Sequence, residues 1–253
     1  MSVLFAVKSC QADQLACFHD AIWNTWGHSV PKIAFDIPTW DLSSSPIHGM
    51  TFSMRWGDLL FFVGGNSQPG THDVLLSCPD GYTDLPYKVR EIMRYFLGTE
   101  HDFVFLCDTD TFVIPKRLLN CGYEKYDITA AFIKGMKPGQ IFRHVVRDPR
   151  GPDIVLERSF APPSGGLGYF LSRKAAQIIA DTEPDPKIWA DDIYVGEALG
   201  PKLASGELTG YQPPDYLDMT FHFPKHRYKT NYFLGAHWME RMYRQYAGDF
   251  PKD

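Results

Sequence analysis

The sequence predicts an α/β protein built on a sheet with helices around it. Two observations lead to this prediction: strand-like and helix-like segments alternate through the first half of the chain, and an almost unbroken hydrophobic strand begins at Phe103 and ends on two carboxylates, Asp108 and Asp110. Alternation of this kind is typical of α/β folds, and continuous apolar runs suit strands that are buried on both faces. With 253 residues and 44% hydrophobic composition, the chain is long enough to bury a substantial core.

The first elements are a strand from Val3 to Val7 and a helix from Ala12 to Trp26. The helix is expected because apolar residues recur near one helical face, namely Leu15, Phe18, Ile22 and Trp26. Two further strands are expected at Leu59–Val63, which ends at two glycines, and at Asp73–Leu76.

A well-marked helix precedes the long hydrophobic strand. Its apolar positions keep to one face, at Leu85, Val89, Ile92, Met93 and Phe96. Asp84 stands where an N-cap would, and Pro86 falls in the first turn. This helix leads directly into the strand that begins at Phe103.

The second half has fewer clear patterns. The segment from Lys134 to Pro163 lacks periodicity, so we expect a functional loop or a mobile one there. Ser172 is placed as the N-cap of a helix that runs through Ile179, and another helix is expected from Asp191 to about Leu199. The last fifty residues are rich in aromatic residues and histidine and give no assignment.

Two carboxylates, Asp108 and Asp110, follow the hydrophobic strand. Ligands of open α/β sheets bind beyond the carboxyl ends of the strands, where these side chains would lie. Close carboxylates repel each other unless a cation or a proton intervenes, and their hard oxygens suit Mn²⁺ or Mg²⁺. A simple turn remains the alternative, because Asp and Thr are common turn formers.

Composition argues against several classes of partner. The formal net charge of −5 gives no basic surface for nucleic acid. The first apolar run is too short for a spanning helix or a signal-peptide core, so no integral membrane segment is expected. The five cysteines form no CxxC pair and lie mostly in apolar runs, as reduced core thiols do. We therefore expect a cytoplasmic protein, unless the chain is a fragment of a membrane-anchored enzyme of the secretory pathway.

Five segments, in order along the chain, resemble the β1,3-glycosyltransferase family that includes galactosyltransferases, N-acetylglucosaminyltransferases and Fringe. They are Ala21–Gly27, Asp80–Lys88, Cys107–Val113, Ser164–Arg173 and Asp191–Gly196. The resemblance implies a single GT-A domain over residues 1–253, with a nucleotide-binding half at about 1–120 and an acceptor-binding half at about 121–253. It also implies a nucleotide-diphospho-sugar donor, of which a UDP-sugar is the expected form, a divalent metal, and inverting transfer to a hydroxyl of a glycan or glycoconjugate.

The resemblance also suggests site residues. Asp110 and Asp108 would hold the metal, and Asp108 could instead meet the donor. The metal of Fringe has a late histidine ligand, which suggests His222 here, with His226 and His237 in reserve. For the base that accepts the proton of the acceptor hydroxyl we expect Asp192, with Asp191 as the alternate; helix capping is the other explanation of this acidic pair.

Four further residues are candidates for contacts with the donor or the acceptor. Gly165 and Gly166 would let the backbone approach a ligand closely, although a turn would also explain them. Lys88 could meet a phosphate, although a solvated helix position is more frequent. Trp189 could stack on a sugar, although a core tryptophan is the commoner outcome.

Two other functions fit the same carboxylates. The first is a sugar-nucleotide or nucleotidyl phosphotransferase, for which the segment after the first strand lacks the expected basic glycine-rich loop. The second is a catalytically silent carbohydrate-binding module on a transferase scaffold, which would not need to keep both acidic motifs.

Overall fold

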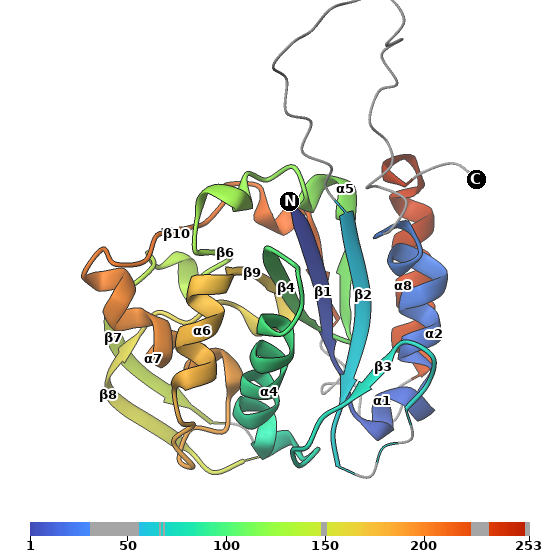
Figure 1. Cartoon of the computed structure of the whole chain (residues 1–253). Helices are drawn as coiled ribbons and strands as arrows, with labels where there is room; N and C mark the ends of the chain where they lie inside the picture. Colours follow the sequence, from blue (N-terminus) through green and yellow to red (C-terminus); the bar gives the residue numbers. More distant parts are fainter. Residues whose placement is uncertain (31–55, 66, 68, 148–150, 224–232, 251–253) are drawn as a thin grey trace, which may run out of the picture.

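The computed structural model describes residues 1–30, 56–65, 67, 69–147, 151–223 and 233–250. Its centre is a seven-stranded mixed sheet flanked by helices, as predicted (Figure 1). In spatial order the strands are β10 (Gly210–Tyr211), β6 (Ile128–Ala130), β9 (Tyr169–Ser172), β4 (Phe103–Asp108), β1 (Ser2–Lys8), β2 (Trp56–Val63) and β3 (Asp73–Leu75). Only β9 runs antiparallel to its neighbours.

The middle of the sheet contains a topological switch. From β1 the chain builds β2 and β3 on one side, and it then returns to add β4 on the other side of β1. Both pairings with β1 are parallel, and Lys8 at the end of β1 lies in register with Asp108 at the end of β4. The crevice beyond such a reversal is where open α/β sheets bind ligands.

Helices cover both faces of this sheet (Figure 1). One face carries α4 (Leu85–Leu97), α6 (Arg173–Asp181) and α7 (Asp191–Ala204), and the other carries α1 (Gln11–Leu15), α2 (Phe18–Ile22) and α8 (Phe233–Gln245). Alternating side chains of β1 separate the two cores because strand side chains point to opposite faces in turn. Phe5 thus packs in the core beside α2, while Leu4 and Ala6 pack beneath α4 and α6.

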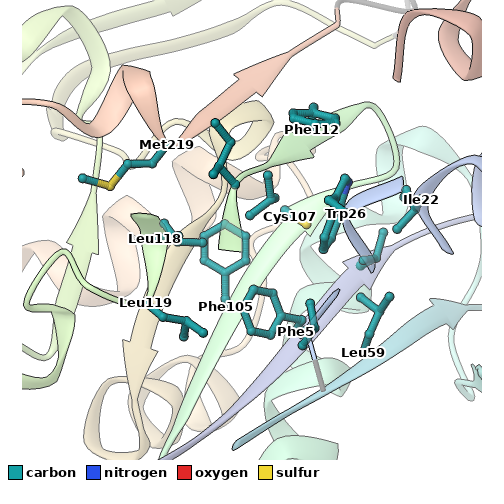
Figure 2. Close-up of a cluster of buried hydrophobic side chains, with 14 of the residues drawn as sticks. Phe5, Ile22, Trp26, Leu59, Phe105, Cys107, Phe112, Leu118, Leu119 and Met219 are labelled. Atoms are coloured by element: carbon teal, nitrogen blue, oxygen red, sulfur yellow. The ribbon is translucent and has the colours of Figure 1, made fainter. Parts of the chain in front are cut away.

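Aromatic side chains fill much of the core beside α2 and α8. Phe5 contacts Phe105 across two adjacent strands, with ring centroids 5.5 Å apart, and Trp26 packs next to them (Figure 2). Phe112, in the short strand β5 (Thr111–Val113), and Met219, which follows the 3-10 turn at Tyr216–Asp218, close the same core (Figure 2). The hydrophobic run that began at Phe103 therefore continues to be buried beyond the two carboxylates.

The predicted helix over Ala12–Trp26 is interrupted. It consists of α1, α2 and a π-helical turn at Trp23–Gly27, and Cys17 between α1 and α2 has a left-handed φ of 61°. This break rotates the first turn away from the face set by Phe18 and Ile22, so Leu15 is 75% exposed instead of buried. Cys17 is also exposed, contrary to the expectation of core thiols.

The helix ends agree with the sequence in one case and differ in another. Ser172 caps α6 as predicted, because its Oγ accepts a hydrogen bond from the Ala175 amide at 3.2 Å. Asp84 stands before α4 but its side chain makes no capping hydrogen bond; a 3-10 turn at Tyr82–Asp84 leads into the helix instead. The helix α7 extends past the expected end at Leu199, to Ala204.

The loop predicted between Lys134 and Pro163 is largely a β-hairpin. Its strands β7 (Ile141–Val146) and β8 (Ile154–Phe160) pair antiparallel with an irregularity between Phe142 and His144, and β8 packs against α7. The outward positions Ile141, Val145 and Val155 are apolar and exposed, which removes the polar alternation that normally reveals a half-buried strand.

The remaining elements complete the second half. A two-stranded antiparallel sheet pairs β5 (Thr111–Val113) with β11 (Thr220–His222), and α5 (Pro115–Leu118) follows β5. Short 3-10 turns occur at Tyr123–Lys125, Ile133–Gly135, Gly165–Leu167, Tyr216–Asp218 and Ala247–Asp249. Within the described residues, no helix has both the length and the apolar composition needed to cross a membrane.

Candidate active site

A cavity of about 610 Å³ lies beyond the ends of β1 and β4. The first turn of α7, the turn at Gly165–Gly166 and the end of β11 form its other walls. Eight of the residues predicted from the sequence line this cavity: Lys88, Asp108, Asp110, Gly165, Gly166, Asp191, Asp192 and His222. Residues from widely separated parts of the chain therefore meet at the switch point of the sheet.

Three of these side chains form a cluster suited to a divalent metal. One potential ligand atom from each of Asp108, Asp110 and His222 lies within 4.8 Å of the others, and His222 Nε2 is 3.4 Å from Asp110 Oδ2. The pairing of β11 with β5 places His222 opposite Thr111, and the Phe223 amide donates to the Asp110 carbonyl at 2.8 Å. Two carboxylates and one imidazole are a donor set that Mn²⁺ accepts, so the residues fit the expected metal.

The glycine turn makes room for the histidine of this cluster. A Cβ on Gly166 would lie 2.7 Å from His222 Nδ1, closer than side-chain carbons approach other atoms. The Gly166 carbonyl is held in place by Thr111 Oγ1, which donates to it at 3.0 Å. Gly165 has more space, with Asp192 Cβ 3.6 Å from the corresponding position. Any side chain at position 166 would therefore require the His222 ring to move.

Lys8 is a residue of the site that the sequence analysis missed. Its ammonium lies 3.0 Å from Asp108 Oδ1 and also forms an ion pair with Asp191, and only 2% of the side chain is exposed. Burial lowers the Lys8 pKa, but the charges of Asp108 and Asp191 outweigh it and raise the pKa well above its usual range, so the group stays charged. A lysine at the end of an otherwise apolar strand was the signal available in the sequence.

The two adjacent acids of α7 have different surroundings. Asp191 pairs with Lys8, whereas Asp192 Oδ1 accepts a hydrogen bond from the Ile193 amide at 2.8 Å. Burial, followed by the nearby charge of Asp191, raises the pKa of Asp192 to about 7. The N-cap position belongs to Ala190, but both acids lie in the first turn, where Asp192 accepts a hydrogen bond from a backbone amide of that turn. Stabilisation of the helix start therefore stays an alternative explanation of this acidic pair.

Lys88 faces the cavity but is closely engaged with the protein. Its ammonium pairs with Asp80 and donates to the Ser9 carbonyl, and the residue is almost completely buried. Asp80 also accepts hydrogen bonds from the Gly64 amide and from Ser67 Oγ, both at 3.1 Å. Lys88 thus ties α4 to the ends of β1 and β2, and its phosphate-binding role remains a prediction.

The middle residue of the acidic triplet joins the site to α1. Thr109 is buried, and its Oγ1 donates to Asp13 Oδ2 at 2.8 Å. Asp13 itself lines the cavity, which the sequence analysis did not predict. This hydrogen bond fixes the turn between the two predicted metal ligands against the first helix.

The other sequence candidates lie elsewhere. Trp189 is 3% exposed, donates from Nε1 to the Pro152 carbonyl at 2.6 Å, and packs beside Tyr82, so it belongs to the core and not to the cavity wall. His237 is exposed on α8, near Glu240, and is not part of the metal cluster. His226 lies outside the described residues.

The family model described as galactosyltransferase matches residues 71–202, which is more than half of the chain. This chain belongs to the galactosyltransferase family. The matched range of this glycosyltransferase includes Asp108, Asp110 and the acidic pair of α7, but neither Lys8 nor His222. The resemblance found in the sequence is confirmed.

Other comparisons add little for this glycosyltransferase. No curated protein matches it. One solved structure, of a Bacillus anthracis protein assigned as a glucose-1-phosphate thymidylyltransferase in complex with a sucrose, is similar over 100% of this chain and 97% of its own, with 11% identity and a TM-score of 0.40. The glycosyltransferase assignment therefore depends on the family match.

Proposed function

We propose that this glycosyltransferase is metal-dependent and inverting, and that it moves a sugar from a UDP-sugar to a hydroxyl of a glycan or glycoconjugate. The observation that supports this most strongly is the arrangement of the cavity. Asp108, Asp110 and His222 cluster together, and Asp192 lines the same cavity from the start of α7. Inversion needs a leaving-group site and a proton acceptor on opposite sides of the anomeric carbon.

Asp108, Asp110 and His222 would bind the divalent cation, for which we propose Mn²⁺, with Mg²⁺ as the alternative. When bound, the cation offsets the negative charge that develops on the departing diphosphate. The protein residues hold the two carboxylates and the imidazole in position through the turn at Thr109 and the pairing of β5 with β11.

Asp192 would accept the proton of the acceptor hydroxyl. A general base works best when its pKa lies near the working pH, and the Asp192 pKa of about 7 meets this condition. Asp191 is less suited because its carboxylate is engaged by the Lys8 ammonium. The structural difference between the two acids thus supports the choice of Asp192.

A transfer assay with a panel of UDP-sugars and acceptors, in Mn²⁺ and in EDTA, tests the function directly. We expect transfer in Mn²⁺ alone, and calorimetry should show that UDP binds more weakly in EDTA. Asp110→Ala should reduce both the transfer rate and the UDP affinity more than Asp108→Ala does, because Asp110 is the more deeply buried of the two and lies beside His222. Asp181→Ala, at the exposed end of α6, is the control. Equal UDP affinity in both conditions would remove the metal from the proposal.

A further inference from the structure

We propose that Lys8 is a positioning residue of the transfer reaction, which holds the first turn of α7 through Asp191 and so presents Asp192 to the acceptor. This role presupposes the proposed transferase function. Lys8 lies at the end of β1, outside the part of the chain matched by the family model.

The position of Lys8 follows from strand geometry. Side chains of β1 alternate between the two faces, and Lys8 shares its face with Leu4 and Ala6, which pack beneath α4 and α6. That face is also covered by α7, so the lysine points toward the helix that carries the two acids. Because β1 is an interior strand, paired with β4 on one side and β2 on the other, it gives the ammonium a rigid base.

The Lys8 ammonium connects carboxylates of two different elements. It contacts Asp108 at the end of β4 and Asp191 at the start of α7. The side chains of Asp108 and Asp191 are 29% and 12% exposed, respectively. Without the cation between them, two partly buried carboxylates would face each other and the first turn of α7 would move outward.

The contacts favour positioning over direct ligand binding. Only 2% of the Lys8 side chain is exposed, and two carboxylates already surround its ammonium. A donor phosphate would have to displace one of them. Asp192 is the residue next to Asp191 on the same helical turn, so a displacement of Asp191 is transmitted directly to the proposed base.

This arrangement also explains why two adjacent acids occur at the start of α7. Asp191 serves as the anchor, and Asp192 serves as the base. A displacement of a reacting group by about 1 Å can reduce the rate by about 10²-fold, so the anchor should affect turnover strongly even though it does not touch the substrate.

The test compares Lys8→Met, Asp191→Asn and the double variant, with Lys202→Met as control. Lys202 forms an exposed ion pair with Glu207, and its loss should leave all constants at the wild-type values. We expect Lys8→Met and Asp191→Asn each to lower kcat by about 10²-fold, while the Kd for UDP in Mn²⁺ changes by less than about threefold. The double variant should lose no more than the worse single variant, because both substitutions remove the same contact.

The double variant also guards against misfolding. Lys8→Met leaves Asp191 buried without its cation, whereas the added Asp191→Asn removes that charge and keeps a hydrogen-bonding side chain. Circular dichroism and the melting temperature show which variants are folded. A folded double variant or a folded Asp191→Asn variant with wild-type kcat would overturn the proposal.

Other outcomes separate the remaining explanations. A large rise in the UDP Kd with unchanged kcat would show that Lys8 binds the donor or supports the metal ligand, and would also overturn it. Additive losses in the double variant would show that Lys8 does not act through Asp191. If the wild-type protein transfers no sugar under any condition while it binds UDP, the proposed function fails first, and the two failures are distinguished.

Discussion

Replacing Asp192 by Asn should remove activity and at the same time stabilise the fold. Asn keeps the Oδ1 acceptor for the Ile193 amide, so the local hydrogen bond at 2.8 Å survives. It cannot accept the acceptor's proton, however, and loss of a general base lowers turnover by about 10² to 10⁴-fold.

The gain in stability follows from the raised pKa of Asp192. The folded protein keeps the proton up to about pH 7, whereas the unfolded chain releases it near the usual value of 3.8. Between these values the folded state binds more protons, so the wild-type free energy of unfolding falls as pH rises, by about 1.4 kcal/mol per pH unit. Over this pH range the wild-type free energy of unfolding falls by at most ~4 kcal/mol, because water screens the partly exposed Asp192 carboxylate.

The Asn variant lacks this pH dependence. Its stability should equal that of the wild type near pH 4, exceed it increasingly up to about pH 7, and keep a constant excess above that value. Urea unfolding in EDTA at a series of pH values measures the difference, with Asp181→Asn as a matched surface control. For the wild type, kcat/KM should rise with pH and level off above about 7. An active Asn variant, or one less stable than the wild type at pH 8, would refute both the role and its electrostatic cause.

Two further predictions concern the site and a residue near it. Gly166→Ala should weaken Mn²⁺ binding, measured by calorimetry, because the new Cβ would lie 2.7 Å from the His222 ring and displace it. Gly165→Ala is the control: the atom nearest to its new Cβ is 3.6 Å away, so its Mn²⁺ affinity should be closer to that of the wild type. Equal losses of affinity in the two variants would contradict this account. Trp189→Phe should lower the free energy of unfolding by about 1 kcal/mol through loss of the hydrogen bond to Pro152, with KM unchanged, and a raised KM would instead restore the sugar-stacking role.

The sequence by itself determined the elements whose pattern is local. The strand at Phe103–Asp108 and the helix at Leu85–Leu97 show continuous or helical apolar spacing, and Ser172 carries a capping side chain. Each of these signals depends on neighbours a few residues apart. The general location of the site followed as well, because carboxylates at the end of a buried strand must emerge at the edge of the sheet.

Only the tertiary structure decided which polar groups share a contact. Lys8 and Asp191 are far apart in the sequence, and their ion pair depends on the register of β1 with β4 and on the packing of α7. The different surroundings of Asp191 and Asp192 have the same origin. No local pattern distinguishes two adjacent acids, because burial and the charges of distant residues set their pKa values.

Long-range packing also overrode local pattern in three places. Cys17 interrupts a sequence that has helical periodicity, and the hairpin of β7 and β8 forms despite its apolar outward positions. Trp189 turns into the core, where Pro152 accepts its N–H, instead of toward the cavity. In each case the deciding contact joins residues that are not neighbours in the local pattern. Periodicity therefore predicts the helices and strands, while tertiary contacts decide where they break, what they pair with and where their side chains point.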